Sequence, residues 1–145
     1  MKRASISLAV YLTFVFCLAA CSEKAAIEVE NIFMHELPPG QSTGAIYMVL
    51  KNNTKQNLVL NYVHSGIASD VEVHRVLYEN GMMQMRQVNH LTLDPGASLR
   101  FEPGGYHLMV MGIEKSPAVG ETFELVMEFE DGYKITTPVE VRPRG

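Results

Sequence analysis

Short stretches in which apolar and polar side chains alternate recur along most of the chain. This two-residue period is typical of β-strands, because successive side chains of a strand point to opposite faces of the sheet. No comparable stretch has the period of about 3.6 residues that marks an amphipathic helix. The alternation predicts strands over residues 45–51, 58–64, 71–78, 83–91, 98–101, 107–113, 122–130 and 134–141.

Turn-forming residues separate these stretches. Glycine, proline, asparagine and aspartate favour turns because they adopt or stabilise backbone conformations that other residues disfavour. The predicted turns lie at residues 38–40, 52–53, 80–81, 94–96, 103–105, 116–120 and 131–132. Neither an internal repeat nor an interdomain linker interrupts this pattern. We therefore predict an all-β fold, a single antiparallel β-sandwich.

The N-terminus has a different pattern. Lys2 and Arg3 precede an apolar stretch over residues 6–18, and small residues follow before Cys21, as in an export signal. The apolar stretch is too short for a transmembrane helix, which needs about 20 residues. Leu-Ala-Ala-Cys resembles the bacterial lipobox, in which the cysteine is acylated after cleavage; the alternative is an ordinary cleaved signal. The expected organisation is a signal peptide at 1–20, lipid on Cys21 within a tether at 21–26, and a folded domain at 27–145.

Charge and cysteine content then exclude several classes of protein. Loss of the leader removes two of the 12 basic residues, so residues 21–145 carry 10 basic and 16 acidic side chains, a formal charge of −6. The basic residues are scattered, which argues against nucleic-acid binding. Cys17 lies in the leader and Cys21 is expected to carry lipid, so the folded domain has neither a disulfide nor a free thiolate.

One hairpin brings a histidine and a methionine onto the same face. Asn-Gly at residues 80–81 favours a two-residue type I′ turn, which sets the register of the strands on either side. In this register Val76 faces Met85, and His74 faces Gln87. His74 and Met85 are then diagonal neighbours about 7–8 Å apart, within reach of a bridging ion.

A second histidine and methionine share a face of another strand. His107 and Met109 are two residues apart in a predicted strand, so their side chains point the same way. Two imidazoles and two thioethers form a soft, neutral donor set that suits Cu(I) and is poor for zinc, magnesium, calcium or manganese. A blue-copper electron-transfer site needs a cysteine thiolate, which this domain lacks. The ligand types therefore favour an ion carrier over a redox centre.

The spacing of His74, Met85, His107 and Met109 reproduces the motif H-x10-M-x21-H-x-M of the periplasmic copper chaperones called PCuAC. The chain resembles this family over most of residues 27–141, with further similar segments at 47–52, 81–86, 93–96 and 101–109.

The resemblance implies a cupredoxin-like Greek-key sandwich that binds one Cu(I) through His74, Met85, His107 and Met109. It also implies delivery of the ion to extracytoplasmic copper sites, above all the copper A site of cytochrome c oxidase. The partners would be the copper subunit of that oxidase or a Sco-type assembly protein. We expect a monomer anchored by its lipid in the bacterial cell envelope, facing the periplasm or the exterior. A carrier must expose its ion, so we expect all four side chains at a partly accessible edge of the sandwich.

Other readings remain open at this point. A catalytic or redox copper domain, a copper-storage or resistance protein, and a sandwich lipoprotein that acts as an interaction module are the alternatives. No nucleophile and base are paired in the sequence, so we predict that the chain is not an enzyme. The remaining histidines and the methionines that flank the motif are expected to serve structure, with Met82, Met83 and Met111 in the core and His35, His64 and His90 at the surface or in turns.

Overall fold

The computed structural model describes residues 25–145, so the predicted signal peptide and Cys21 lie outside the described residues. The described chain forms ten strands and no helix, and thus contains no helix long and apolar enough to cross a membrane. The strands are β1 (Ile27–His35), β2 (Gly44–Asn52), β3 (Leu58–His64), β4 (Asp70–Glu79), β5 (Met82–Gln87), β6 (Leu91–Leu93), β7 (Ser98–Phe101), β8 (Tyr106–Met111), β9 (Thr122–Phe129) and β10 (Lys134–Arg142).

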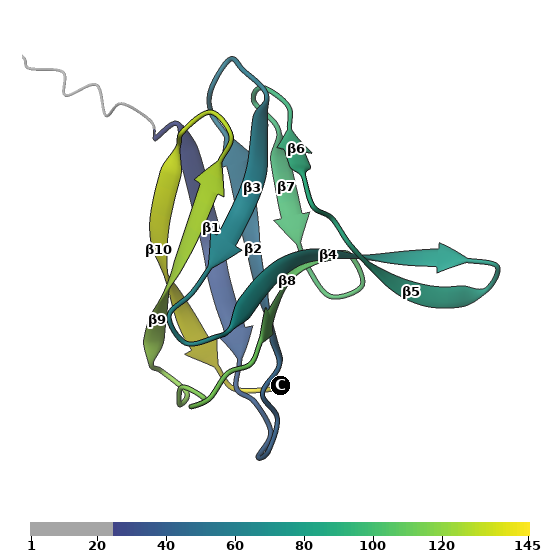
Figure 1. Cartoon of the computed structure of the whole chain (residues 1–145), viewed down its shortest axis with the longest axis vertical. Coiled ribbons are helices and arrows are strands. Elements are labelled where there is room, and N and C mark those ends of the chain that lie inside the picture. Colours follow the sequence, from purple (N-terminus) through teal and green to yellow (C-terminus); the bar gives the residue numbers. More distant parts are fainter. Residues whose placement is uncertain (1–24) are drawn as a thin grey trace, which may run out of the picture.

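These strands belong to one continuous sheet in the order β5-β4-β8-β7-β2-β1-β10-β9-β3-β6. All strand pairs are antiparallel except β1–β10 and β7–β8. The sheet folds back on itself, so that β3 contacts β4 without pairing with it (Figure 1). The predicted all-β antiparallel sandwich is confirmed, and its two layers are parts of the same sheet.

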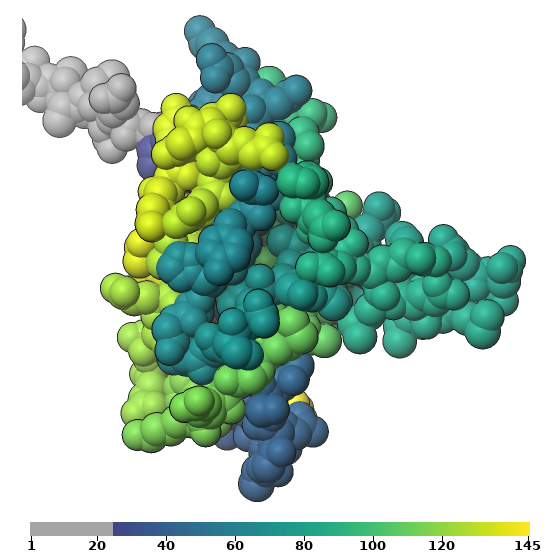
Figure 2. All heavy atoms as spheres, viewed as in Figure 1, coloured from purple at the N-terminus to yellow at the C-terminus, as the bar shows by residue number. Residues whose placement is uncertain are grey.

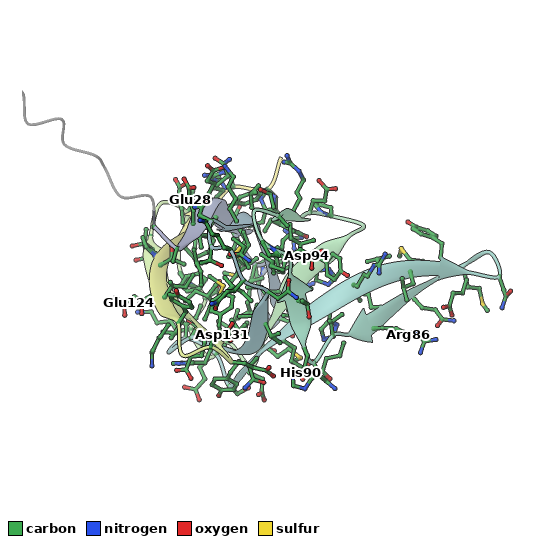
Figure 3. All side chains as sticks on the ribbon, turned by 90° about the horizontal axis from the view of Figure 1, so that it is seen from above. Glu28, Arg86, His90, Asp94, Glu124 and Asp131 are labelled. Carbon is green, nitrogen blue, oxygen red and sulfur yellow. The ribbon has the colours of Figure 1, made fainter. Side chains whose placement is uncertain are left out.

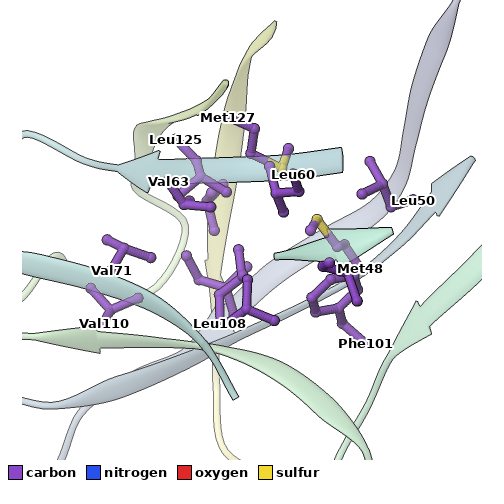
Figure 4. Packing of buried hydrophobic residues seen from close by; sticks show 14 of the residues in the cluster. Met48, Leu50, Leu60, Val63, Val71, Phe101, Leu108, Val110, Leu125 and Met127 are labelled. Carbon is purple, nitrogen blue, oxygen red and sulfur yellow. The ribbon is translucent and has the colours of Figure 1, made fainter. Parts of the chain in front are cut away.

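The hydrophobic core fills the space between the two layers (Figure 4). Along β9 every second side chain is buried, as the alternation in the sequence predicts. Burying a large aliphatic side chain contributes about 1.5–3 kcal/mol, so this cluster is the main source of stability in residues 25–145, which contain no cysteine. Its fully buried members include Met48, Leu50, Leu58, Leu60, Phe101, Leu108, Val110, Leu125 and Met127.

Strand β1 was missing from the sequence prediction because its alternation is broken. Asn31 adopts a φ of 53°, and the pairing with β2 shifts register between Glu30 and Phe33. Such a bulge inserts an extra residue and moves the following side chains to the other face. The apolar pattern of this segment therefore fits neither a regular strand nor a helix.

The predicted strand at residues 83–91 is wrong in its extent. It is divided into β5, which pairs with β4, and β6, which pairs with β3 in the opposite layer. The chain changes layer over residues 88–90, after the amide of Val88 has donated a last hydrogen bond to the carbonyl of Val73 at 2.8 Å. Alternation within one segment cannot reveal that its two ends pair with different partners.

The β4–β5 hairpin projects well beyond the sandwich (Figures 1 and 2). Its turn consists of Asn80 and Gly81, with φ values of 52° and 76°. Two consecutive positive φ values define a type I′ turn, which glycine and asparagine tolerate better than other residues. The predicted turn and its register are thus confirmed.

Candidate metal centre

Strand β4 connects the projecting hairpin to the sandwich, and His74 lies at the junction. On one side His74 pairs with Gln87 of β5, and Val76 pairs with Met85. These are the pairs predicted from the Asn-Gly turn. Since residues two apart on a strand share a face, Met85 is a diagonal neighbour of His74.

On its other side β4 pairs with β8, and this pairing joins the two halves of the motif. His74 lies directly opposite His107, and Glu72 lies opposite Met109. The imidazole rings of His74 and His107 have centroids 5.9 Å apart. All four predicted ligands are therefore on one face of the adjacent strands β5, β4 and β8, which we call the ligand face.

The surroundings of His107 favour its neutral form. Its ring Nδ1–H donates to the carbonyl of Gly105 at 3.3 Å, so that the neutral ring keeps an unprotonated Nε2. Burial lowers the pKa of His107; the hydrogen bond to Gly105 opposes this shift, and the nearby His74 adds to it. A neutral imidazole with a free lone pair is the form that binds a metal ion.

His74 has the complementary arrangement. Its Nε2–H donates to the Glu72 carboxylate at 2.7 Å, which leaves Nδ1 as the unprotonated nitrogen of the neutral ring. This Nδ1 is buried and makes no hydrogen bond with any described residue. A buried polar atom without a partner is costly, and an unmet ligand is one physical reason for its presence. A carboxylate that holds the other ring nitrogen is a common feature of metal-binding histidines.

The ligand face is accessible at one end and buried at the other. Met85 lies on the edge strand β5 and its side chain is 55% exposed, whereas His107 is only 6% exposed. The expected partly accessible edge is therefore correct for Met85 and wrong for His107. The reason is that β8 lies inside the sheet, between β4 and β7.

The flanking methionines differ from the prediction. Met82 and Met83 are 60% and 65% exposed, and Met111 is half-buried, so the expected core packing is wrong for the first two. Both lie on the projecting hairpin, where no second layer covers them. Met83 lies two residues from Met85 on the same strand, so its side chain also points to the ligand face. The alternation of the predicted strand already implies this position, but our sequence analysis did not use it.

The other histidines lie apart from these four residues, as predicted. His35 contacts the carbonyl of Pro143 at 2.9 Å, His64 lies 3.7 Å from Glu128, and His90 lies 3.3 Å from Glu130. Glu72, in contrast, was missed in the sequence analysis. Glu72 lies two residues before His74 in a predicted strand, and this spacing could have identified it as a neighbour of His74 on the same face.

No other arrangement in residues 25–145 competes as a metal site. Within this range no group of three or more His, Cys, Asp or Glu side chains is placed to hold an ion. A cavity of about 840 Å³ lies beside the loops around Ile67 and Lys115 and includes none of the four residues. The ligand face offers two imidazole nitrogens and two thioethers, a donor set for a soft cation.

Comparison with known proteins agrees with this geometry. A family model described as "Putative lipoprotein LpqE-like" matches residues 27–141. The chain belongs to the LpqE-like family. Among curated relatives, "Putative lipoprotein Lxx21020" of Leifsonia xyli is 27% identical over 103 residues, and "Uncharacterized protein RP573" of Rickettsia prowazekii is 25% identical over 101 residues. These matches cover 70% and 69% of this chain but only 61% and 56% of the relatives.

Solved structures share the fold of this LpqE-like chain. The copper-bound PCuAC domain from PmoF2 has a TM-score of 0.70 and 22% identity, over 82% of this chain and 94% of that one. The Cu(I) form of DR1885 from Deinococcus radiodurans has a TM-score of 0.69 and 24% identity, over 87% and 84% of the two chains. The resemblance to the PCuAC family is thus confirmed in the fold.

Proposed function

We propose that this LpqE-like protein is a carrier that binds one Cu(I) through His74, Met85, His107 and Met109. The observation that carries the proposal is the buried, unpartnered Nδ1 of His74 on a face that also holds His107 and two thioethers. The PCuAC domain of PmoF2 and DR1885, which share the fold, have been solved with copper and Cu(I), respectively.

The donor set explains why the cargo is Cu(I) and not a harder ion. Thioethers bind soft metals and add no charge, whereas zinc prefers thiolate, imidazole and carboxylate ligands. The carboxylate of Glu72 is engaged with His74 and contributes its negative charge from outside the donor set. Four neutral donors suit a singly charged ion.

Carriage fits the geometry better than storage or catalysis. Met85 is exposed on a hairpin that extends away from the sandwich, so a ligand of another protein can reach the ion and replace this thioether. We propose the copper A site of cytochrome c oxidase as the destination, reached directly or through a Sco-type assembly protein. The carrier acts as a monomer.

Anchoring to the cell envelope completes the proposal. It is supported by the lipobox-like sequence before Cys21 and by the name of the family, and it makes Cys21 the site of lipid attachment. Mass spectrometry of the native N-terminus tests this role. An unmodified, soluble protein would contradict it.

Metal selectivity is the first test of the proposed function. Under reducing conditions the protein should bind one equivalent of Cu(I), measured by competition with a chromophoric chelator, and bind zinc far more weakly. The physical reason is that zinc gains little from the two thioethers. If zinc displaced Cu(I) at equal concentration, the methionines would not be ligands and the proposal would fail.

A second prediction concerns Glu72. The substitution Glu72→Gln removes the negative charge that holds the Nε2–H of His74. Nδ1 is then no longer fixed as the unprotonated nitrogen of the His74 ring. Changes in such partners of ligating histidines typically weaken metal binding by about 10- to 100-fold. We expect a loss of Cu(I) affinity in this range.

Glu79→Gln is the matched control for this change, because Glu79 lies on the same strand but on the opposite face, where it contacts Arg86 at 3.3 Å. It should leave the affinity unchanged. An equal loss in both variants would show an effect of net charge and remove the special role of Glu72.

A further inference from the structure

The projecting hairpin carries an additional thioether on the ligand face. Met83 lies two residues from Met85 on β5 and pairs with Tyr78 of β4. Residues two apart on a strand are about 7 Å apart along it and point to the same side. Methionine side chains are long and flexible, so one ion can contact both sulfur atoms. The preceding residue, Met82, points to the opposite face.

The two faces of the hairpin differ in chemistry. Arg86 lies on the projecting hairpin (Figure 3). On the face opposite the ligands it contacts Glu79 at 3.3 Å and Gln84 at 2.9 Å. The outer part of the ligand face consists of apolar and thioether side chains, namely Val76, Tyr78, Met83 and Met85. The side-chain contacts of Arg86 thus lie on the face opposite the thioethers of Met83 and Met85.

Exposure increases from the buried histidines towards the tip of the hairpin. His107 is 6% exposed, Met85 is 55% exposed and Met83 is 65% exposed. An ion that leaves the histidines while still bound to Met85 can therefore reach the sulfur of Met83, the next side chain on the same face towards the tip. This order is what a stepwise exchange of ligands requires.

We propose that Met83 is an entry and exit ligand, a transient thioether site through which Cu(I) passes to and from the four-ligand centre. This inference rests on the proposed function. In the exit step the sulfur of Met83 binds the ion while a bond to a histidine or to Met109 breaks. The copper stays Cu(I) throughout, and neither a proton nor an electron is transferred in this exchange.

Met83→Leu and Met82→Leu provide a matched pair. Leucine keeps roughly the volume and apolarity of methionine but removes the thioether, and both side chains are similarly exposed on β5. The full-length protein is loaded with one equivalent of Cu(I), and transfer to excess bathocuproine disulfonate is followed by stopped-flow absorbance. We expect Met83→Leu to slow release several-fold with an unchanged equilibrium affinity, and Met82→Leu to change neither quantity.

Each other outcome has a defined meaning. Unchanged release from Met83→Leu overturns the inference, as does equal slowing in both variants, which would show a general effect of the hairpin surface. A loss of equilibrium affinity in Met83→Leu would make Met83 a permanent ligand and also overturn the transient role. If the wild-type protein failed to bind Cu(I), or if Met85→Leu kept native affinity, the proposed function itself would be at fault.

Discussion

His107→Ala should abolish Cu(I) binding in the physiological range, with a loss of affinity of more than about 100-fold, the upper end of the effect of changing only a partner of a ligand. The imidazole of His107 is the least exposed of the four donors, and the hydrogen bond to Gly105 fixes which nitrogen is free. No neighbouring side chain on the ligand face can replace it, since the opposite position on β4 is already His74.

The variant should nevertheless fold. The carbonyl of Gly105 retains a hydrogen bond from the amide of Val76 at 3.1 Å, so removing the His107 ring leaves no buried carbonyl without a donor. Circular dichroism and denaturant unfolding measure the structure, and chelator competition measures the affinity. Native affinity in a folded His107→Ala protein would remove His107 from the ligand set.

The pH dependence of the Cu(I) affinity is an independent test of the role of His107. A proton competes with the ion for the free nitrogen, so the affinity falls as the pH decreases through the pKa of His107. Because burial lowers this pKa, the decrease due to His107 should begin below the usual range of an exposed histidine. That component should persist in the pH profile of Met109→Leu, which weakens Cu(I) binding but keeps the His107 imidazole.

The largest effect on stability is expected at the neighbouring residue. Leu108 is fully buried between the two layers, and Leu108→Ala should lower the free energy of unfolding by about 2–5 kcal/mol, through lost burial and the cavity that remains. Denaturant titration measures this loss. Copper affinity of the fraction that remains folded should change little, because Leu108 points away from the ligand face.

Met109→Leu changes the next residue along β8 and should have the opposite effects: the free energy of unfolding should change little, and the affinity for Cu(I) should decrease. Such a swap usually costs less than about 1.5 kcal/mol even in a core, so folding should survive while Cu(I) affinity decreases. If Met109→Leu unfolded the domain, Met109 would be a core residue. If Leu108→Ala were as stable as the wild type, the assignment of the two faces of β8 would be wrong.

The sequence predicted the local features of this structure well. The Asn-Gly turn alone determined the register of the hairpin, and the pairs Val76 with Met85 and His74 with Gln87 are present as predicted. Six other predicted strands begin and end within two residues of the observed ones. These features depend on alternation and turn chemistry, which act between residues close in the chain.

Features that depend on distant contacts were not predictable in the same way. The pairing of His74 with His107 joins segments separated by more than thirty residues, and no local pattern specifies it. The bulge at Asn31 concealed β1, and the change of layer after Gln87 divided a predicted strand. The exposure of Met82 and Met83 follows from a hairpin that extends past the sandwich, which alternation cannot show.

X-ray absorption spectroscopy of the Cu(I)-loaded protein tests the central claim most directly, because it identifies the atoms bound to the ion. The account predicts a mixed shell of two nitrogen and two sulfur donors, and the loss of one sulfur donor in either Met85→Leu or Met109→Leu. A shell of nitrogen and oxygen without sulfur, or a sulfur contribution unchanged in both variants, would contradict it.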